Sequence, residues 1–289
     1  MKSKPRMIFS ILLILFALFL VACYSTSNET FESCLETIET TLATIFTTSS
    51  TEPTTDLTTI PESTETTEPV YLDFEPGDHR ETYILDSGLY YSCYVHIPEN
   101  MTAGMPLIVW LCGQDEVGNG WLIKNSGVIK AAKALDEERF VILQPFGNDY
   151  GSTMELIDLV VEKYSIDEDR VILTGHSLGG LLTWSWAERD PDRWAAVVPV
   201  SNKPCVITDN LLESDLSVWA FWSDWDVESN RYGMKAGVEA LIESGTHVEV
   251  KWTEMSHVFH GDMAWRPYDQ DFFDWAAKKR RKQINESEE

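Results

Sequence analysis

The residues that could do chemistry gather first around Ser177. The sequence from Gly175 to Gly179 reads Gly-His-Ser-Leu-Gly, which fits the pattern G-x-S-x-G. The apolar run Val171–Leu173 precedes this pattern, and apolar residues at helical spacing follow it. We therefore expect a buried strand, a sharp turn and a helix, which would expose the serine hydroxyl as a nucleophile. The amino end of the helix would favour negative charge that develops beside it.

A nucleophilic serine needs a neighbouring base, and the base needs an acid that orients it. When the serine lies on such a turn, the acid and then the base follow it along the chain. The predicted strand Val218–Trp222 runs into two carboxylates, Asp224 and Asp226. We expect Asp226 to be the acid and keep Asp224 as the alternative.

The sequence offers six histidines for the base. Four of them precede the serine, lie inside its turn or open a predicted strand: His79, His96, His176 and His247. Only His257 and His260 follow the last predicted strand, where the base must come. We expect His257 to be the base and keep His260 as the alternative. These two histidines lack a third ligand nearby, so we expect no metal site.

Attack on a carbonyl leaves an oxyanion, which fixed backbone N–H groups must hold. One donor is expected at Leu178, the residue after the nucleophile. We expect the other at Gln114, in the loop after the predicted strand Pro106–Leu111, where Gly113 permits the turn.

The chain has eleven tryptophans, most of them at core periodicities. Trp225 differs because it lies between the two candidate acids, where it could line a pocket for a sugar or an aromatic acyl group. Trp121, after the oxyanion loop, and Trp265, after the base, are further candidates for contact with substrate.

Strands and helices alternate through the part of the chain that follows residue 69. The runs His79–Asp86 and Leu89–Ile97 predict an antiparallel hairpin. Buried strands then alternate with helical patterns, among them Trp121–Glu138 and a final helix, Asp269–Arg281. This order predicts an α/β fold with a mainly parallel, eight-stranded sheet between helices, and catalytic groups at the carboxyl ends of its strands. No long insertion follows the predicted strand that ends at Val200, so we expect no large lid.

On these motifs the chain resembles the α/β-hydrolase superfamily from Val70 to Ala277, and within it the compact secreted esterases related to polyhydroxybutyrate depolymerase, feruloyl esterase and acetylxylan esterase. It shares features with dienelactone hydrolase and with the catalytic domain of prolyl oligopeptidase. The most specific matching segments are Pro106–Gly113, Tyr164–Val171 and Gly175–Gly180. His257-Val-Phe259 resembles the His-x-Phe of dienelactone hydrolases, and Ser223–Asp226 fits the Gly-x-x-Asp turn of the family. One departure is Cys112, where the family usually has histidine.

The resemblance implies a serine carboxylic-ester hydrolase that works through an acyl-enzyme without a cofactor. Its substrates would be small-molecule esters or esters on extracellular polysaccharides. A peptidase like prolyl oligopeptidase is the second interpretation, although no propeller domain is expected. A surface-binding module with a vestigial triad is the third.

The beginning of the chain predicts export. Basic residues precede the apolar run Ile8–Val21, and Leu20–Cys23 resembles the lipobox of bacterial lipoproteins. We expect a signal peptide over residues 1–22, a lipid on the thiol of Cys23 and a disordered spacer rich in Thr, Ser, Glu and Pro over residues 23–69. The catalytic domain would then cover residues 70–283, followed by a short tail over 284–289. This places the domain on the outer face of a bacterial membrane, held there by its lipid.

The net charge of −25 would repel nucleic acid, so we expect none as a partner. Cys93, Cys112 and Cys205 form an odd set without a C-x-x-C pair, which favours neither a disulfide framework nor a zinc site. Cys93 and Cys112 are expected to be buried apolar residues.

Overall fold

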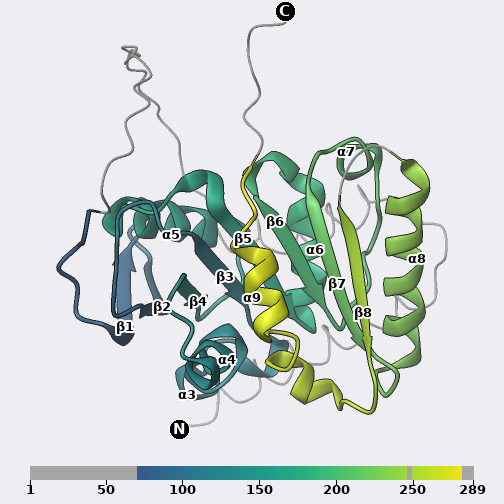
Figure 1. Cartoon of the computed structure of the whole chain (residues 1–289), viewed down its shortest axis with the longest axis horizontal. Coiled ribbons are helices and arrows are strands. Elements are labelled where there is room, and N and C mark those ends of the chain that lie inside the picture. Colours follow the sequence, from purple (N-terminus) through teal and green to yellow (C-terminus); the bar gives the residue numbers. More distant parts are fainter. Residues whose placement is uncertain (1–69, 246–248, 282–289) are drawn as a thin grey trace, which may run out of the picture. The chain divides into compact units, whose positions relative to one another are not determined.

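The computed structural model describes residues 70–245 and 249–281, which contain an eight-stranded sheet (Figure 1). Its strands follow the order β1-β2-β4-β3-β5-β6-β7-β8. They are β1 (Gly77–Ile84), β2 (Tyr90–Ile97), β3 (Leu107–Leu111), β4 (Val141–Pro145), β5 (Val171–His176), β6 (Ala196–Val200), β7 (Ser217–Ser223) and β8 (Val250–Met255). β2 pairs antiparallel with β1 and with β4, and the remaining pairs are parallel. The predicted hairpin and mainly parallel sheet are confirmed.

Helices cover both faces of this sheet (Figure 1). They are α3 (Gly120–Lys124), α4 (Gly127–Leu135), α5 (Tyr150–Lys163), α6 (Leu178–Arg189), α7 (Asp209–Leu212), α8 (Glu228–Ser244) and α9 (Gln270–Ala276), with short 3-10 turns at η1 (Gln114–Glu116), η2 (Glu168–Arg170), η3 (Pro191–Arg193) and η4 (His260–Ala264). Two separate apolar clusters fill the space between the layers. α3, α4 and α9 contribute to one, and α5, α6, α7 and α8 contribute to the other. Because both faces are covered, β3, β4 and β6 are buried along their whole length.

The helix predicted over Trp121–Glu138 is two helices in the structure. The helix is interrupted before Gly127, whose φ of 62° lies in the left-handed region. A Cβ at Gly127 would lie 2.5 Å from the Trp110 ring, so only glycine fits there. The buried Gln144 side chain then joins the two pieces, because it donates to the carbonyl of Ile123 and accepts from the N–H of Ile129.

Cys93 and Cys112 are fully buried, as expected. Burial raises the pKa of the Cys112 thiol to about 12. Both residues therefore serve as small apolar side chains near neutral pH.

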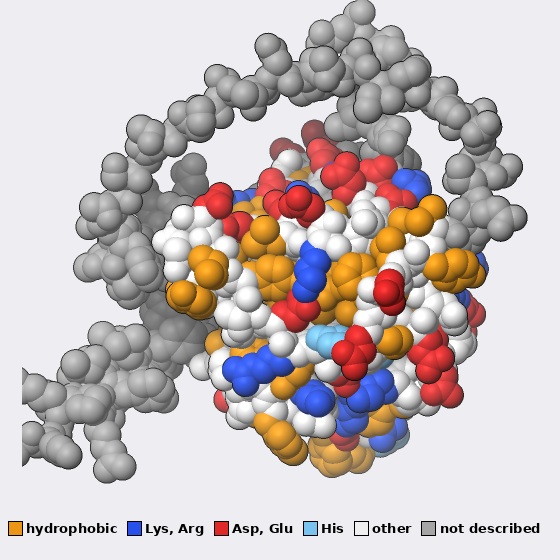
Figure 2. All heavy atoms as spheres, turned by 90° about the vertical axis from the view of Figure 1, so that its left-hand side faces the viewer, with side chains coloured by type: hydrophobic (Ala, Val, Ile, Leu, Met, Phe, Trp, Pro, Cys, Tyr) orange, Lys and Arg blue, Asp and Glu red, His pale blue; other side chains and the backbone are white. Residues whose placement is uncertain are grey.

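The predicted signal peptide, Cys23, the spacer, His247 and the tail after Gln283 lie outside the described residues. Within the described ranges, no helix is both long enough and apolar enough to cross a membrane. Seen from the side that carries β1 and β2, hydrophobic side chains are interspersed with acidic and basic ones (Figure 2). The hairpin contributes Ile84 and Tyr90 to the exposed hydrophobic residues.

Candidate active site

Ser177 lies on the sharp turn between β5 and α6. Its φ of 56° and ψ of −115° are unusual for a residue with a side chain, which is the strain expected of a nucleophile on such a turn. The N–H of Ser177 donates to the carbonyl of Val200, which fixes the turn to β6. A Cβ at Gly179 would lie 2.0 Å from the carbonyl oxygen of Leu111, so the pattern needs glycine there for close packing against β3.

Ser177, His260 and Asp226 form one hydrogen-bonded series. The Nε2 atom of His260 lies 3.0 Å from the Oγ atom of Ser177. The Nδ1 atom of the same ring lies 2.8 Å from Oδ1 of Asp226. The three side chains come from the turn after β5, the loop after β7 and the start of η4, so the sheet brings them together at the carboxyl ends of its parallel strands.

The expectation that His257 lies against the serine is wrong. β8 ends at Met255, and His257 adopts a left-handed φ of 60° in the turn that follows. Its ring is exposed and lies 4.9 Å from the ring of Trp225 instead. The loop needs three more residues before it returns to the sheet, and His260 is the histidine that then reaches Ser177.

Asp226 occupies the position expected of the acid, with its side chain fully buried. Burial by itself would raise the pKa of this carboxyl group. Hydrogen bonds from His260 and from the N–H of Val227, both to Oδ1, hold the pKa below its ordinary value. Asp226 therefore stays ionised and can hold the Nδ1–H of His260.

Asp224, the alternative acid, has another task. Its Oδ1 atom accepts the backbone N–H of His257 at 2.6 Å, and its carbonyl accepts from the guanidinium of Arg231. The neighbouring Ser223 hydroxyl accepts the N–H groups of Trp225 and Val258. Together these contacts fasten the loop after β7 to the loop after β8.

The oxyanion loop follows β3. The N–H of Gly113 is taken by the carboxylate of Glu116 at 2.8 Å, so it is not available to a substrate. Gln114 comes next, begins η1 and is exposed, and Leu178 begins α6 and is partly exposed. The two backbone positions predicted as donors therefore both lie at starts of helical turns, whose first N–H groups have no partner within the helix.

Comparisons with known proteins find similarity in sequence. Residues 142–285 match the model of the Prolyl oligopeptidase family. The chain is 29% identical over 131 residues to the bifunctional acetylxylan esterase/xylanase XynS20E of Neocallimastix patriciarum; the match covers 41% of this chain and 19% of that protein.

Solved structures resemble the chain in fold. A thermostable esterase matches with a TM-score of 0.59 and 22% identity, over 71% of this chain and 63% of that one. The feruloyl esterase module from Clostridium thermocellum, complexed with sinapinate, matches with a TM-score of 0.56 and 17% identity, over 75% of this chain and 96% of that one. The chain has the α/β-hydrolase fold. With Ser177, His260 and Asp226 in series, it is a serine hydrolase of that fold.

Two exposed aromatic side chains come from the loops that carry the acid and the base. Trp225 is 49% exposed, and its ring lies 4.9 Å from that of Phe259, which is 64% exposed. The two residues directly precede Asp226 and His260 in the sequence. Phe259 was not among the expected substrate contacts, although its position beside a candidate base is the signal that could have found it.

The other two candidates for contact with substrate are Trp121 and Trp265. Trp121 is exposed on α3. The ammonium group of Lys130 lies over the Trp265 ring, 4.1 Å from the ring centroid. The ring of Trp225 contacts the rings of His257 and Phe259. Among the described residues, no ring contact joins Trp225 to Trp121 or to Trp265.

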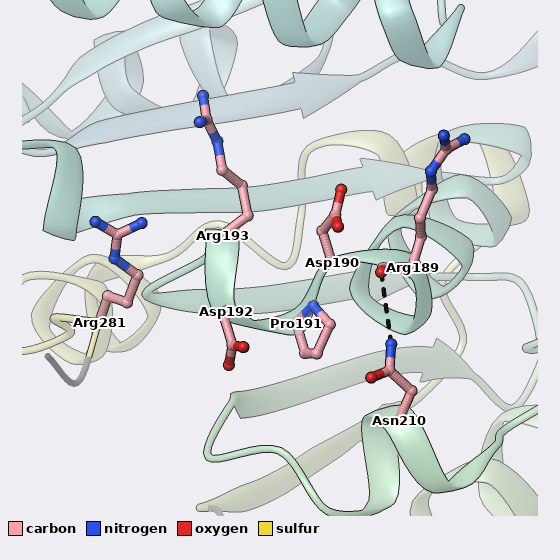
Figure 3. Close-up of a pocket in the computed structure, with 7 residues that line it drawn as sticks. All are labelled: Arg189, Asp190, Pro191, Asp192, Arg193, Asn210 and Arg281. Atoms are coloured by element: carbon pink, nitrogen blue, oxygen red, sulfur yellow. Dashed lines mark hydrogen bonds between the residues drawn. The ribbon is translucent and has the colours of Figure 1, made fainter. Parts of the chain in front are cut away.

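A hollow away from the triad lies at the end of α6 and around η3 (Figure 3). The guanidinium groups of its arginines lie apart from one another in the close-up. Arg193 pairs with Asp158, and Arg281 pairs with Asp169. The side chain of Asn210 donates to the carbonyl of Arg189. Because two of these arginines already pair with carboxylates, the hollow is not an assembled anion site. Within the described residues, no three His, Cys, Asp or Glu side chains gather as a metal site.

Proposed function

We propose that this serine hydrolase cleaves carboxylic esters through an acyl-enzyme. The observation that supports it most is the series Ser177–His260–Asp226. His260 takes the hydroxyl proton as Ser177 attacks the ester carbonyl, and Asp226 steadies the imidazolium that forms. His260 then gives the proton to the leaving alcohol. A water molecule, activated by the same imidazole, attacks the acyl-enzyme, and the released acid leaves Ser177 free.

The charge that develops on the carbonyl oxygen needs donors that are already in place. We assign this task to the backbone N–H groups of Leu178 and Gln114. Glu116 supports the assignment, because its carboxylate holds Gly113 and thereby fixes the backbone that leads into Gln114.

The substrates we propose are esters on extracellular polysaccharides, such as feruloyl or acetyl groups, or related small esters. The exposed rings of Trp225 and Phe259 support this, since flat apolar surfaces suit aromatic acyl groups and sugar rings. The names of XynS20E and of the Clostridium thermocellum module point the same way. No long segment separates β6 from β7, so polymers would find the site open.

A matched pair of substitutions tests the proposal. His260→Asn should lower kcat for p-nitrophenyl acetate by at least ~10³-fold, because the general base is lost. His257→Asn should change kcat by no more than about threefold, since asparagine tolerates the left-handed backbone and the ring contacts no triad residue. A fluorophosphonate probe should label Ser177 in the wild type and leave Ser177→Ala unlabelled. Equal loss in both histidine variants, or no adduct on folded wild type, would overturn the proposal.

A peptidase is the second candidate, because residues 142–285 match the Prolyl oligopeptidase family. The same triad would then cleave an amide. Methyl ferulate and acetylated xylan, set beside aminoacyl-proline amides, separate the two chemistries. Faster turnover of the amides would favour the peptidase.

We also propose that the signal peptide is cleaved before Cys23 and that a lipid is attached to the Cys23 thiol. This lipid would hold the enzyme on the outer face of a bacterial membrane. The lipobox-like Leu20–Cys23 supports this. Labelled palmitate should enter the wild type expressed in bacteria and be absent from Cys23→Ala, which should be released from the membrane fraction.

A further inference from the structure

His176 lies directly before the nucleophile, at the end of β5, and is 5% exposed. It is neither the base nor a ligand, and the proposed reaction gives it no task. A polar ring in such a place is costly to bury unless its nitrogen atoms are used. Its contacts show what it holds.

One nitrogen of His176 binds the backbone of the base. Its Nε2 atom lies 2.8 Å from the carbonyl oxygen of His260. A carbonyl oxygen only accepts, so Nε2 carries the proton and donates. The two imidazole rings also lie against each other, with centroids 4.7 Å apart. Asp226 thus holds the ring of His260 through its side chain, while His176 holds the main chain of the same residue.

The other nitrogen of His176 faces the oxyanion loop. Nδ1 is buried and has no hydrogen-bond partner among the described residues. A Cβ built on Gly113 would lie 3.5 Å from this nitrogen and 3.2 Å from the Glu116 carboxylate. The ring therefore packs against the loop that carries Gln114. Ser177 is its neighbour in the chain, so one side chain touches all three parts of the site.

The charge state of His176 agrees with this geometry. Burial, and then the nearby positive charge that His260 can carry, lower the pKa of His176 to about 4. The ring is therefore neutral at neutral pH and presents a single N–H, the one that meets the carbonyl of His260. It supplies the donor without placing a second positive charge beside the catalytic imidazole.

We propose that His176 is a positioning residue, whose Nε2–H keeps the base loop closed on Ser177 and on the oxyanion loop. This rests on the proposed triad chemistry. The hydrogen bond itself contributes little to stability. Its effect on the rate is larger, since a base that lies ~1 Å out of place can lose ~10²-fold.

Two substitutions separate the donor from the shape of the ring. His176→Phe keeps an aromatic ring and removes the N–H, while His176→Gln offers an amide N–H near the position of Nε2. Turnover of p-nitrophenyl acetate is measured per fluorophosphonate-titrated site, so that unfolded protein does not count. We expect His176→Phe to lower kcat by ~10- to ~100-fold with KM nearly unchanged, and His176→Gln to recover most of the loss.

A spectroscopic readout keeps the test independent of activity. The proton between His260 and Asp226 should give a downfield NMR signal in the wild type and in His176→Gln, and a broadened or shifted one in His176→Phe. An inactive wild type that shows this signal would count against the proposed function alone. Wild-type kcat and an unchanged signal in His176→Phe would overturn the positioning role, and so would equal losses in both variants.

Discussion

Asp224 and Asp226 lie two residues apart and hold different groups. Asp226 accepts from the ring of His260, whereas Asp224 accepts from the backbone of His257. The same carboxylate chemistry thus serves proton transfer at one position and loop geometry at the other. The difference is one of direction, because the turn after β7 sends the first side chain toward the loop after β8 and buries the second.

Replacing each carboxylate by its amide should separate these tasks. Asp226→Asn should lower kcat by ~10⁴-fold, because the amide favours the wrong tautomer of His260. Asp224→Asn keeps the oxygen that accepts the N–H of His257, so its kcat should stay within about threefold of the wild type. Initial rates with p-nitrophenyl acetate measure both. An equal loss in the two variants would mean that Asp226 is not the acid.

At the scale of elements, the break between α3 and α4 is set by a contact with the sheet. Gly127 combines a left-handed φ of 62° with a Cβ position 2.5 Å from the Trp110 ring. Gly118 has a similar φ of 75° but nothing within 4 Å of its Cβ position. An added methyl group would therefore meet the Trp110 ring at Gly127 and open space at Gly118.

Alanine at both positions measures backbone and packing costs separately. Gly118→Ala should lower the free energy of unfolding by about 1 kcal/mol, the cost of a left-handed backbone. Gly127→Ala should add ~1 to ~3 kcal/mol of overpacking to that cost. Urea denaturation followed by fluorescence gives both values. Equal losses of unfolding free energy in the two variants would show that the Trp110 ring moves aside at little cost.

α6 and α7 are joined by an unusual carboxyl group. Glu188, 4% exposed near the end of α6, accepts the N–H of Thr208, the residue that caps α7. Burial raises its pKa to about 7 from an ordinary value of 4.5, despite its hydrogen bonds. The folded state therefore holds this proton over a pH range in which the unfolded chain has lost it.

This shift predicts how stability changes with pH. Where the native state binds more protons than the unfolded state, stability falls as the pH rises. The contribution of Glu188 is therefore fully present below about pH 4.5 and should be lost by about pH 7, a change of about 2 to 3 kcal/mol. Glu188→Gln cannot ionise and should lack this fall, while the exposed Glu243→Gln should keep it. Melting temperatures measured between pH 4.5 and pH 7 test this prediction. A fall in melting temperature of equal size in Glu188→Gln and in the wild type would contradict it.

At the scale of the whole molecule, the net charge of −25 acts on every substrate that approaches the active site. An anionic ester should be repelled at low salt, and added salt should screen the repulsion. We expect kcat/KM for p-nitrophenyl succinate to rise several-fold from low to high salt. The value for the neutral p-nitrophenyl butyrate should change little. A fall for the anionic ester would point to a local positive field at the site.

Much of the fold and part of the site follow from local sequence. The turn at Ser177 needs only contiguous residues, since the strand, the glycines and the helix that shape it are all within one stretch. The alternation of buried strands with amphipathic helices likewise predicts a parallel sheet, and a parallel sheet gathers its strand ends at one edge. The sequence therefore determined the nucleophile, the fold class and the region where its partners must lie.

The tertiary structure decided which of the nearby partners arrives. His257 and His260 have the same chemistry and lie three residues apart, so neither spacing nor residue type separates them. The loop after β8 is shaped by contacts with the loop after β7, a distant segment that binds the N–H groups of His257 and Val258. These long-range bonds turn the first ring outward and bring the second to Ser177. Gly127 shows the same limit, since its reason for breaking the helix is a tryptophan on a neighbouring strand.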